Sequence, residues 1–255
     1  MKGLACLFVL AVALFGVSCG GGSSFQNSST AQIRIMQASG DMGNVDVQIN
    51  GKSVANNLGW RQTFPTPTTS YSSVKAGTVH YQEFATGTAS PALVDTQLGL
   101  SAKTFYTIIT AGEESSGTVG TILLTDDHVA PAAGELRVRF VNAASTLGPV
   151  DLSFTSGSNG LPPPVPALGY KSSTSYLSFT GTSIQLCVNW AGAALPGGGL
   201  SGVGNPCPLT VILQFKTPPQ NSMTFVIVDP PSVPPDPSQS GGFTLTGPTF
   251  ASLPF

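Results

Sequence analysis

Charged side chains are scarce in this chain of 255 residues. Asp, Glu, Lys and Arg together make up 9% of the residues, against roughly 25% in an average soluble protein. The formal net charge is −2, and the sequence contains no run of basic residues. Nucleic-acid binding needs a basic surface that neutralises phosphates. The composition therefore excludes nucleic acid as a partner.

Histidine is equally rare, and this limits the chemistry that the chain can carry. His80 and His128 are the only two histidines, whereas hydrolytic triads and zinc sites depend on histidine beside further ligands or a nucleophile. We predict no catalytic residue, no cofactor and no metal. One acidic group is an alternative, because carboxylate oxygens suit calcium. It consists of Asp126, Asp127 and Glu135, which are otherwise interpreted as parts of a solvated junction and its flank.

A sustained helical period is also missing beyond the N-terminus. The 30 glycines and 21 prolines disfavour helices. Val45, Val47 and Ile49 alternate with polar residues, which is typical of a half-buried strand. The dipeptide Asn50-Gly51 that follows them is a strong signal for a tight hairpin. Short strands with regular turn signals predict an all-β fold, a β-sandwich of immunoglobulin-like type built from antiparallel strands.

The N-terminal segment predicts export. A positive start is followed by an apolar run over residues 4–17 and by small residues that end at Cys19. This pattern is typical of a secretory signal peptide, here residues 1–18. A Gly/Ser-rich tether follows over residues 19–30. The segment resembles the bacterial lipobox, which implies lipidation of Cys19 and an outer-membrane lipoprotein in the cell envelope. Cleavage by an ordinary signal peptidase is the alternative.

Two further cysteines lie in the predicted mature chain. Cys187 and Cys207 are an even pair in an exported protein, and this favours a disulfide between them. The bridge would close a loop of about 20 residues.

The chain also repeats itself. Three pairs of segments match at one constant offset: IRIMQA at 33–38 with VRFVNA at 138–143, VDV at 45–47 with VDL at 150–152, and TSY at 69–71 with TSY at 174–176. The repeat predicts two tandem β-sandwiches. They comprise residues 31–126 and 135–255, joined by a linker over residues 127–134.

Charged and aromatic residues recur within this repeat. Arg34 with Asp46, and Arg139 with Asp151, are predicted to be cross-strand pairs facing solvent, worth less than ~1 kcal/mol. Six aromatic residues offer a platform for stacking sugars as an alternative to core packing. They are Trp60, Tyr71, Tyr81, Tyr170, Tyr176 and Trp190.

The opening of the first repeat carries a family resemblance. Residues 34–41 (RIMQASGD), the VDV triplet and the Asn50-Gly51 turn resemble the bacterial domain-of-unknown-function family 4397. The histidine of that family is Gln37 here. The resemblance implies tandem exported β-sandwiches in the cell envelope and carries no assigned catalysis.

These observations predict a non-catalytic, lipid-anchored envelope protein. Its tandem β-sandwiches would serve adhesion, envelope structure or ligand capture. A carbohydrate-binding surface module is the alternative, and an extracytoplasmic enzyme of unknown type comes third. The expected partners are the membrane, through the lipid anchor, and either envelope polysaccharide or another surface protein.

Overall fold

The fold is built from strands. The computed structural model describes seven segments: residues 29–66, 71–155, 161–180, 183–191, 209–214, 222–229 and 251–254. These residues form strands and turns without a helix, which confirms the predicted all-β sandwich. None of them belongs to an apolar helix long enough to cross a bilayer. The predicted signal peptide, Cys19 and Cys207 lie outside the described residues.

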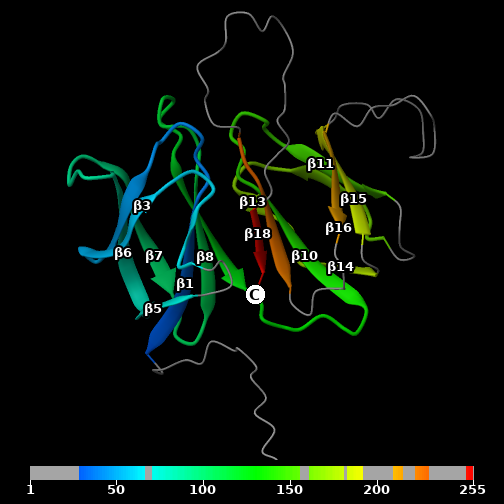
Figure 1. Ribbon diagram of the computed structural model, residues 1–255, viewed down its shortest axis with the longest axis horizontal. Coiled ribbons are helices and arrows are strands. Elements are labelled where there is room, and N and C mark those ends of the chain that lie inside the picture. Colours follow the sequence, from blue (N-terminus) through cyan, green and yellow to red (C-terminus); the bar gives the residue numbers. More distant parts are fainter. Residues whose placement is uncertain are drawn as a thin grey trace, which may run out of the picture.

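Residues 30–126 form two sheets, which we term the first sheet pair (Figure 1). The outer sheet has the order β3-β2-β6-β7, and the inner sheet has the order β4-β1-β8-β9 with β5 also paired to β1. The bounds are β1 (Thr30–Gln37), β2 (Val45–Ile49), β3 (Lys52–Leu58), β4 (Thr63–Phe64), β5 (Ser72–Lys75), β6 (Gly77–Ala85), β7 (Ala92–Leu100), β8 (Phe105–Ala111) and β9 (Gly120–Asp126).

The described strands between residues 135 and 254 form the second sheet pair. Its outer sheet has the order β12-β11-β15-β16, and its inner sheet has the order β13-β10-β17-β18 with β14 also paired to β10. The bounds are β10 (Glu135–Asn142), β11 (Val150–Thr155), β12 (Val165–Leu168), β13 (Ser172–Ser173), β14 (Leu177–Thr180), β15 (Ser183–Trp190), β16 (Leu209–Gln214), β17 (Met223–Ile227) and β18 (Ala251–Pro254).

Alternation along the strands generates one apolar core in each sheet pair. Ile35 of β1 and Val47 of β2 face each other's sheets in the first core. Phe140 of β10 and Leu152 of β11 lie in the second core. All four side chains are fully buried. Asn50 and Gly51 both have positive φ, at 51° and 71°, between the paired strands β2 and β3, so the predicted hairpin is confirmed.

Each inner sheet contains one parallel strand pair. Strand β1 pairs in parallel with β8, and β10 pairs in parallel with β17, whereas the other described pairs are antiparallel. The parallel registers place Arg34 opposite Thr107 and Arg139 opposite Thr224.

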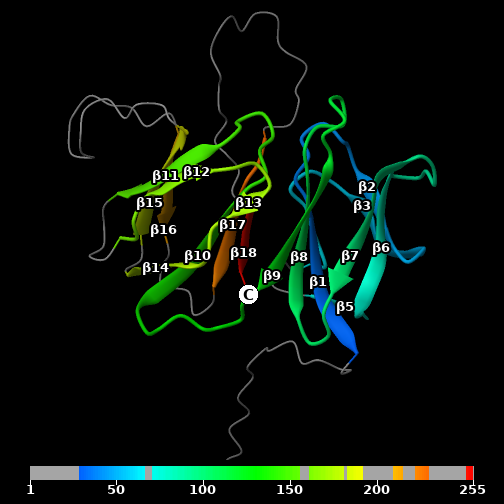
Figure 2. The same ribbon diagram turned by 180° about the vertical axis from the view of Figure 1, so that it is seen from behind.

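The two inner sheets pack against each other through a third apolar cluster, which we term the seam. Figures 1 and 2 show these sheets side by side at the centre of the molecule. Strands β1 and β10 are consequently covered on both faces, and seven of the eight residues of β1 are buried. The buried residues of the seam are Met36, Ala38, Ile109, Ala111, Ile122, Leu124, Val141, Ala143, Val226 and Val228.

Candidate functional site

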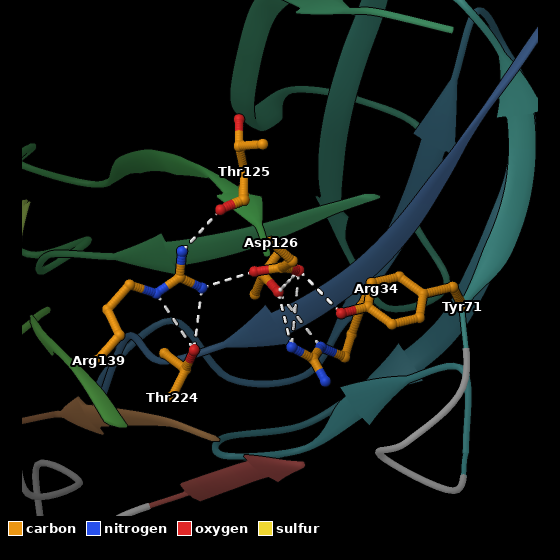
Figure 3. Close-up of polar contacts among 7 residues, drawn as sticks. Arg34, Tyr71, Thr125, Asp126, Arg139 and Thr224 are labelled. Carbon is orange, nitrogen blue, oxygen red and sulfur yellow. Dashed lines mark hydrogen bonds and ion pairs between the residues drawn. The ribbon is translucent and has the colours of Figure 1, made fainter. Parts of the chain in front are cut away.

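A buried polar cluster lies at one end of the seam (Figure 3). Arg34 and Arg139 stand on β1 and β10, on the faces opposite to the two sheet-pair cores, and Asp126 ends β9. Their exposed fractions are 0%, 4% and 6%. Charged residues of these types are almost never fully buried unless they are paired. The location of the cluster therefore implies that its members satisfy one another.

Asp126 connects the two inner sheets. Its Oδ1 accepts a hydrogen bond of 2.6 Å from Nη2 of Arg139, and its Oδ2 lies 3.7 Å from Nη2 of Arg34. The hydroxyls of Tyr71 and Thr107 donate to the same Oδ2 at 2.9 and 2.6 Å. One carboxylate thus accepts from both sheet pairs, and charge-assisted bonds of this kind are roughly twice as strong as neutral ones.

Each arginine is oriented by the threonine beside it on the parallel neighbouring strand. Arg34 donates from Nε and Nη2 to the Thr107 hydroxyl at 3.3 and 2.8 Å. Arg139 donates from the same two atoms to the Thr224 hydroxyl at 3.2 and 2.9 Å. Arg139 also donates from Nη1 to the carbonyl of Thr125 at 2.8 Å, a second bond across the seam.

Tyrosine rings cover both guanidinium groups. The guanidinium carbon of Arg34 lies 4.9 Å from the centre of the Tyr71 ring, and that of Arg139 lies 4.9 Å from the Tyr176 ring, within the range of cation–π attraction. Burial lowers the pKa of Arg34, and the nearby Tyr71 and Asp126 oppose this shift. Burial also raises the pKa of Tyr71. The rings keep water from the charges that Asp126 neutralises.

Among the residues that the structure describes, Asp126 is the carboxylate that contacts both guanidinium groups of the cluster.

The predicted charge pairs are wrong. Asp46 accepts hydrogen bonds from the backbone N–H groups of Asn57 and Gly87, at 2.8 and 2.9 Å, and Asp151 accepts one from that of Ala167 at 2.6 Å. The arginines are buried because the second face of their strands meets the other inner sheet instead of solvent. Strand alternation gives the face of a residue but not what covers that face.

Two of the three calcium candidates have other partners in the structure, and the calcium alternative stays untested. Asp126 is engaged as described above, and Asp127 forms a 2.7 Å ion pair with Arg137 that lowers the pKa of the carboxyl. No group of three or more His, Cys, Asp or Glu suited to a metal occurs among the described residues. The description of Asp126 as part of a solvated junction is wrong, since it ends a buried strand.

The aromatic residues do not assemble into a platform within the described part of the chain. Tyr81 is buried in the first core, and Trp60 and Tyr170 pack against the seam. Tyr71 and Tyr176 cover the arginines and are partly buried, and Trp190 is the one of the six that is largely exposed, at 46%. His80 is partly exposed and bonds Asp95 at 2.7 Å. Cys187 is buried on β15, and its predicted bridge to Cys207 stays a prediction.

One buried carboxyl group was not identified from the sequence. Glu83 lies on β6 and accepts hydrogen bonds from the hydroxyls of Tyr81 and Thr110. Its Oε2 is buried and has no hydrogen-bond partner among the described residues. Burial raises its pKa. The available signal was its parity, because Glu83 falls on the same face of β6 as the apolar Val79 and Tyr81.

A groove opens beside the buried cluster, with a volume of about 520 Å³. It lies between β9 of the first sheet pair and residues 173–176 of the second. Its lining is mostly polar and consists of Leu123, Leu124, Thr125, Asp127, Arg137, Arg139, Ser173, Thr174, Ser175 and Tyr176.

Part of the chain matches the model of a known family. Residues 31–153 match the family described as Domain of unknown function (DUF4397). The matched DUF4397 segment contains Arg34, Asp126 and Arg139, and it ends within β11. This supports the resemblance to that family.

The chain is also similar in structure to a solved carbohydrate-binding module. A solved structure, described as "Alpha-glucan recognition by family 41 carbohydrate-binding modules from streptococcal virulence factors", is similar at 11% identity with a TM-score of 0.26; the match covers 78% of this chain and 95% of the other. At this level the similarity carries no argument about function. No curated protein matches the chain.

Proposed function

We propose that the protein is a non-catalytic, lipid-anchored envelope protein in which two copies of one β-sandwich unit form a single rigid module. The module would present its surfaces for adhesion, envelope structure or ligand capture. The observation that carries the proposal is the seam, where one carboxylate holds arginines from both sheet pairs.

Equivalent contacts in the two sheet pairs support two copies of one unit. The Arg–Thr contact recurs at equivalent positions of the parallel strand pairs. The amide nitrogens of Gln37 and Asn142 each donate to the carbonyl of the residue six positions later, Gly43 and Gly148. The same side-chain contacts at equivalent strand positions are more specific evidence for two copies of one unit than a shared sandwich architecture is.

The seam supports rigidity because it combines apolar and ionic contacts. Ten buried apolar residues lie between the inner sheets. At the end away from Asp126, Nζ of Lys171 donates to the Thr118 carbonyl at 3.3 Å. A Cβ on Gly112 would lie 2.8 Å from the Tyr170 hydroxyl, so the two halves approach closely there. Large apolar interfaces oppose relative motion of domains.

Calorimetry of the fragment 29–255 tests the rigid module. We expect one cooperative unfolding transition for both sheet pairs, because the seam couples their stabilities. Two well-separated transitions would contradict the proposal. Protease treatment of intact cells tests whether the protein lies on the cell surface. A protein on the surface should be digested, whereas a protein that the protease reaches only after lysis would not lie there.

A carbohydrate-binding role is a second candidate, favoured by the groove beside the cluster. The groove is lined by four hydroxyl side chains and a tyrosine ring, which are groups that can bind sugar hydroxyls and ring faces. A glycan array probed with the soluble fragment tests this role, and the absence of saturable binding to any glycan would reject it.

A further inference from the structure

We infer that the first sheet pair holds a site for a covalent cross-link within its own core, an ester between the hydroxyl of Thr110 and the carboxamide of Gln37. Glu83 would serve as the base. The three side chains come from β8, β1 and β6 and are fully buried. The inference goes beyond the proposed function and does not depend on it, because the reaction would occur once, within a single chain.

A nucleophile and a base are in contact in this core. The hydroxyl of Thr110 donates a hydrogen bond to Oε1 of Glu83, and the hydroxyl of Tyr81 donates to the same oxygen and holds it in place. A hydroxyl that directs its proton at a neighbouring base is activated as a nucleophile. Burial raises the pKa of Glu83, so its carboxylate is a stronger base than an exposed one.

The carboxamide of Gln37 lies beside this nucleophile. Gln37 and Thr110 are direct partners in the parallel register of β1 and β8, on the same face as the core residues Ile35 and Ile108. Neighbouring strands are ~5 Å apart, a gap that an ester between these two side chains can span. The amide nitrogen of Gln37 donates to the carbonyl of Gly43 at 2.9 Å, whereas its Oε1 is buried without a hydrogen-bond partner among the described residues. The amide is thus anchored at its nitrogen.

The reaction exchanges an amide for an ester. Oγ1 of Thr110 attacks Cδ of Gln37 while its proton passes to the Glu83 carboxylate. The bond between Cδ and Nε2 of Gln37 then breaks, Glu83 gives the proton to the departing nitrogen, and ammonia leaves. One C–O bond replaces one C–N bond, and no group is oxidised or reduced. Burial keeps water from the product and so protects the ester from hydrolysis.

The second sheet pair shows that the architecture does not require these polar residues. Asn142 stands where Gln37 stands, but its register partner on β17 is Ile227, and Val188 takes the position of Glu83. The amide of Asn142 is also hydrogen-bonded through both its nitrogen and its oxygen. Because apolar residues suffice at these positions of the second core, the buried acid and hydroxyl of the first core indicate a local function.

A cross-link at this place would strengthen the first sheet pair. It would join β1 to β8, so β1 could not leave the inner sheet unless a covalent bond broke. Cross-links between residues that are distant in sequence also restrict the unfolded chain. Because the cross-link would itself add stability, the stabilities of the wild type and of variants at these positions are compared for chains that have not reacted.

Peptide mapping of the purified full-length protein tests the cross-link. Trypsin cleaves after Lys and Arg, so Gln37 and Thr110 fall on separate peptides, residues 35–52 and 104–137. We expect the two peptides to be joined in one species whose mass is their sum less one ammonia, with the junction at Gln37 and Thr110. Hydroxylamine, which cleaves esters, should separate them. Recovery of both peptides only in the unlinked form would overturn the inference.

Three variants and one matched control assign the chemistry. Thr110→Val removes the nucleophile, Glu83→Gln removes the base, and Gln37→Met removes the carboxamide; each should abolish the joined species completely. Thr121→Val makes the first of these changes at the register partner of Thr110 on its other side, in β9, and should leave the cross-link intact. A cooperative unfolding transition establishes that a variant is folded. Joined peptides in any of the three variants, or their loss in Thr121→Val, would contradict the assignment.

Discussion

Asp126→Asn is the most informative single change in this protein. The asparagine preserves the size of the side chain and one acceptor oxygen, but it removes the negative charge between Arg34 and Arg139. Both guanidinium groups are almost completely buried. They would remain in the seam without the carboxylate that contacts them both.

The expected loss of stability is large. Removing one partner of a buried ion pair costs about 3–5 kcal/mol, because the other charge is left uncompensated. Whole domains are stabilised by only ~5–15 kcal/mol. For a chain of this size the change should lower the melting temperature by on the order of 10 °C.

Asp127→Asn is the matched control. Its ion pair with Arg137 has side-chain exposures of 40% and 18%, and pairs near the surface contribute ~0–1 kcal/mol. Urea denaturation of both variants measures the difference. Adding Arg34→Met to Asp126→Asn should recover part of the loss, since one of the two buried charges that Asp126 contacted disappears. Equal stabilities for Asp126→Asn and Asp127→Asn would refute the reasoning about the seam.

Three further predictions concern other parts of the chain. Burial raises the pKa of Glu83 above its ordinary value of 4.5, so the folded state keeps this proton after the unfolded chain releases it, and stability falls as the pH rises past that value. Glu83→Gln should remove this fall and make the protein more stable than the wild type at neutral pH, which urea denaturation between about pH 5 and 8 measures. An unchanged dependence of stability on pH in the variant would contradict the prediction. Reduction of a Cys187–Cys207 bridge should cost roughly 2–4 kcal/mol, and two reactive thiols in the unfolded, unreduced protein would rule the bridge out. Cys19→Ala should release the protein from the membrane fraction, and recovery of the wild-type chain as a secreted, unmodified protein would disprove the anchor.

Local features of the sequence were sufficient to predict the strands. The alternation through Val47 and the Asn50-Gly51 turn give a strand and its hairpin, because side-chain direction in a strand has a period of two and this dipeptide tolerates positive φ at both positions. The core positions of Ile35 and Phe140 follow from the same alternation. Glu83 could have been assigned to the core by its parity, although its hydroxyl partner on β8, Thr110, could not.

The candidate site depends on contacts that no local pattern contains. The sequence by itself determined that Arg34 lies on the opposite face of β1 from Ile35. Only the tertiary structure decided that this face meets a second sheet instead of water, and that Asp126, which looks like part of a polar linker, ends a strand between two arginines. The physical reason is that alternation encodes direction within one strand, whereas burial depends on which sheets pack together. That packing brings Arg34 and Arg139 to the carboxylate of Asp126.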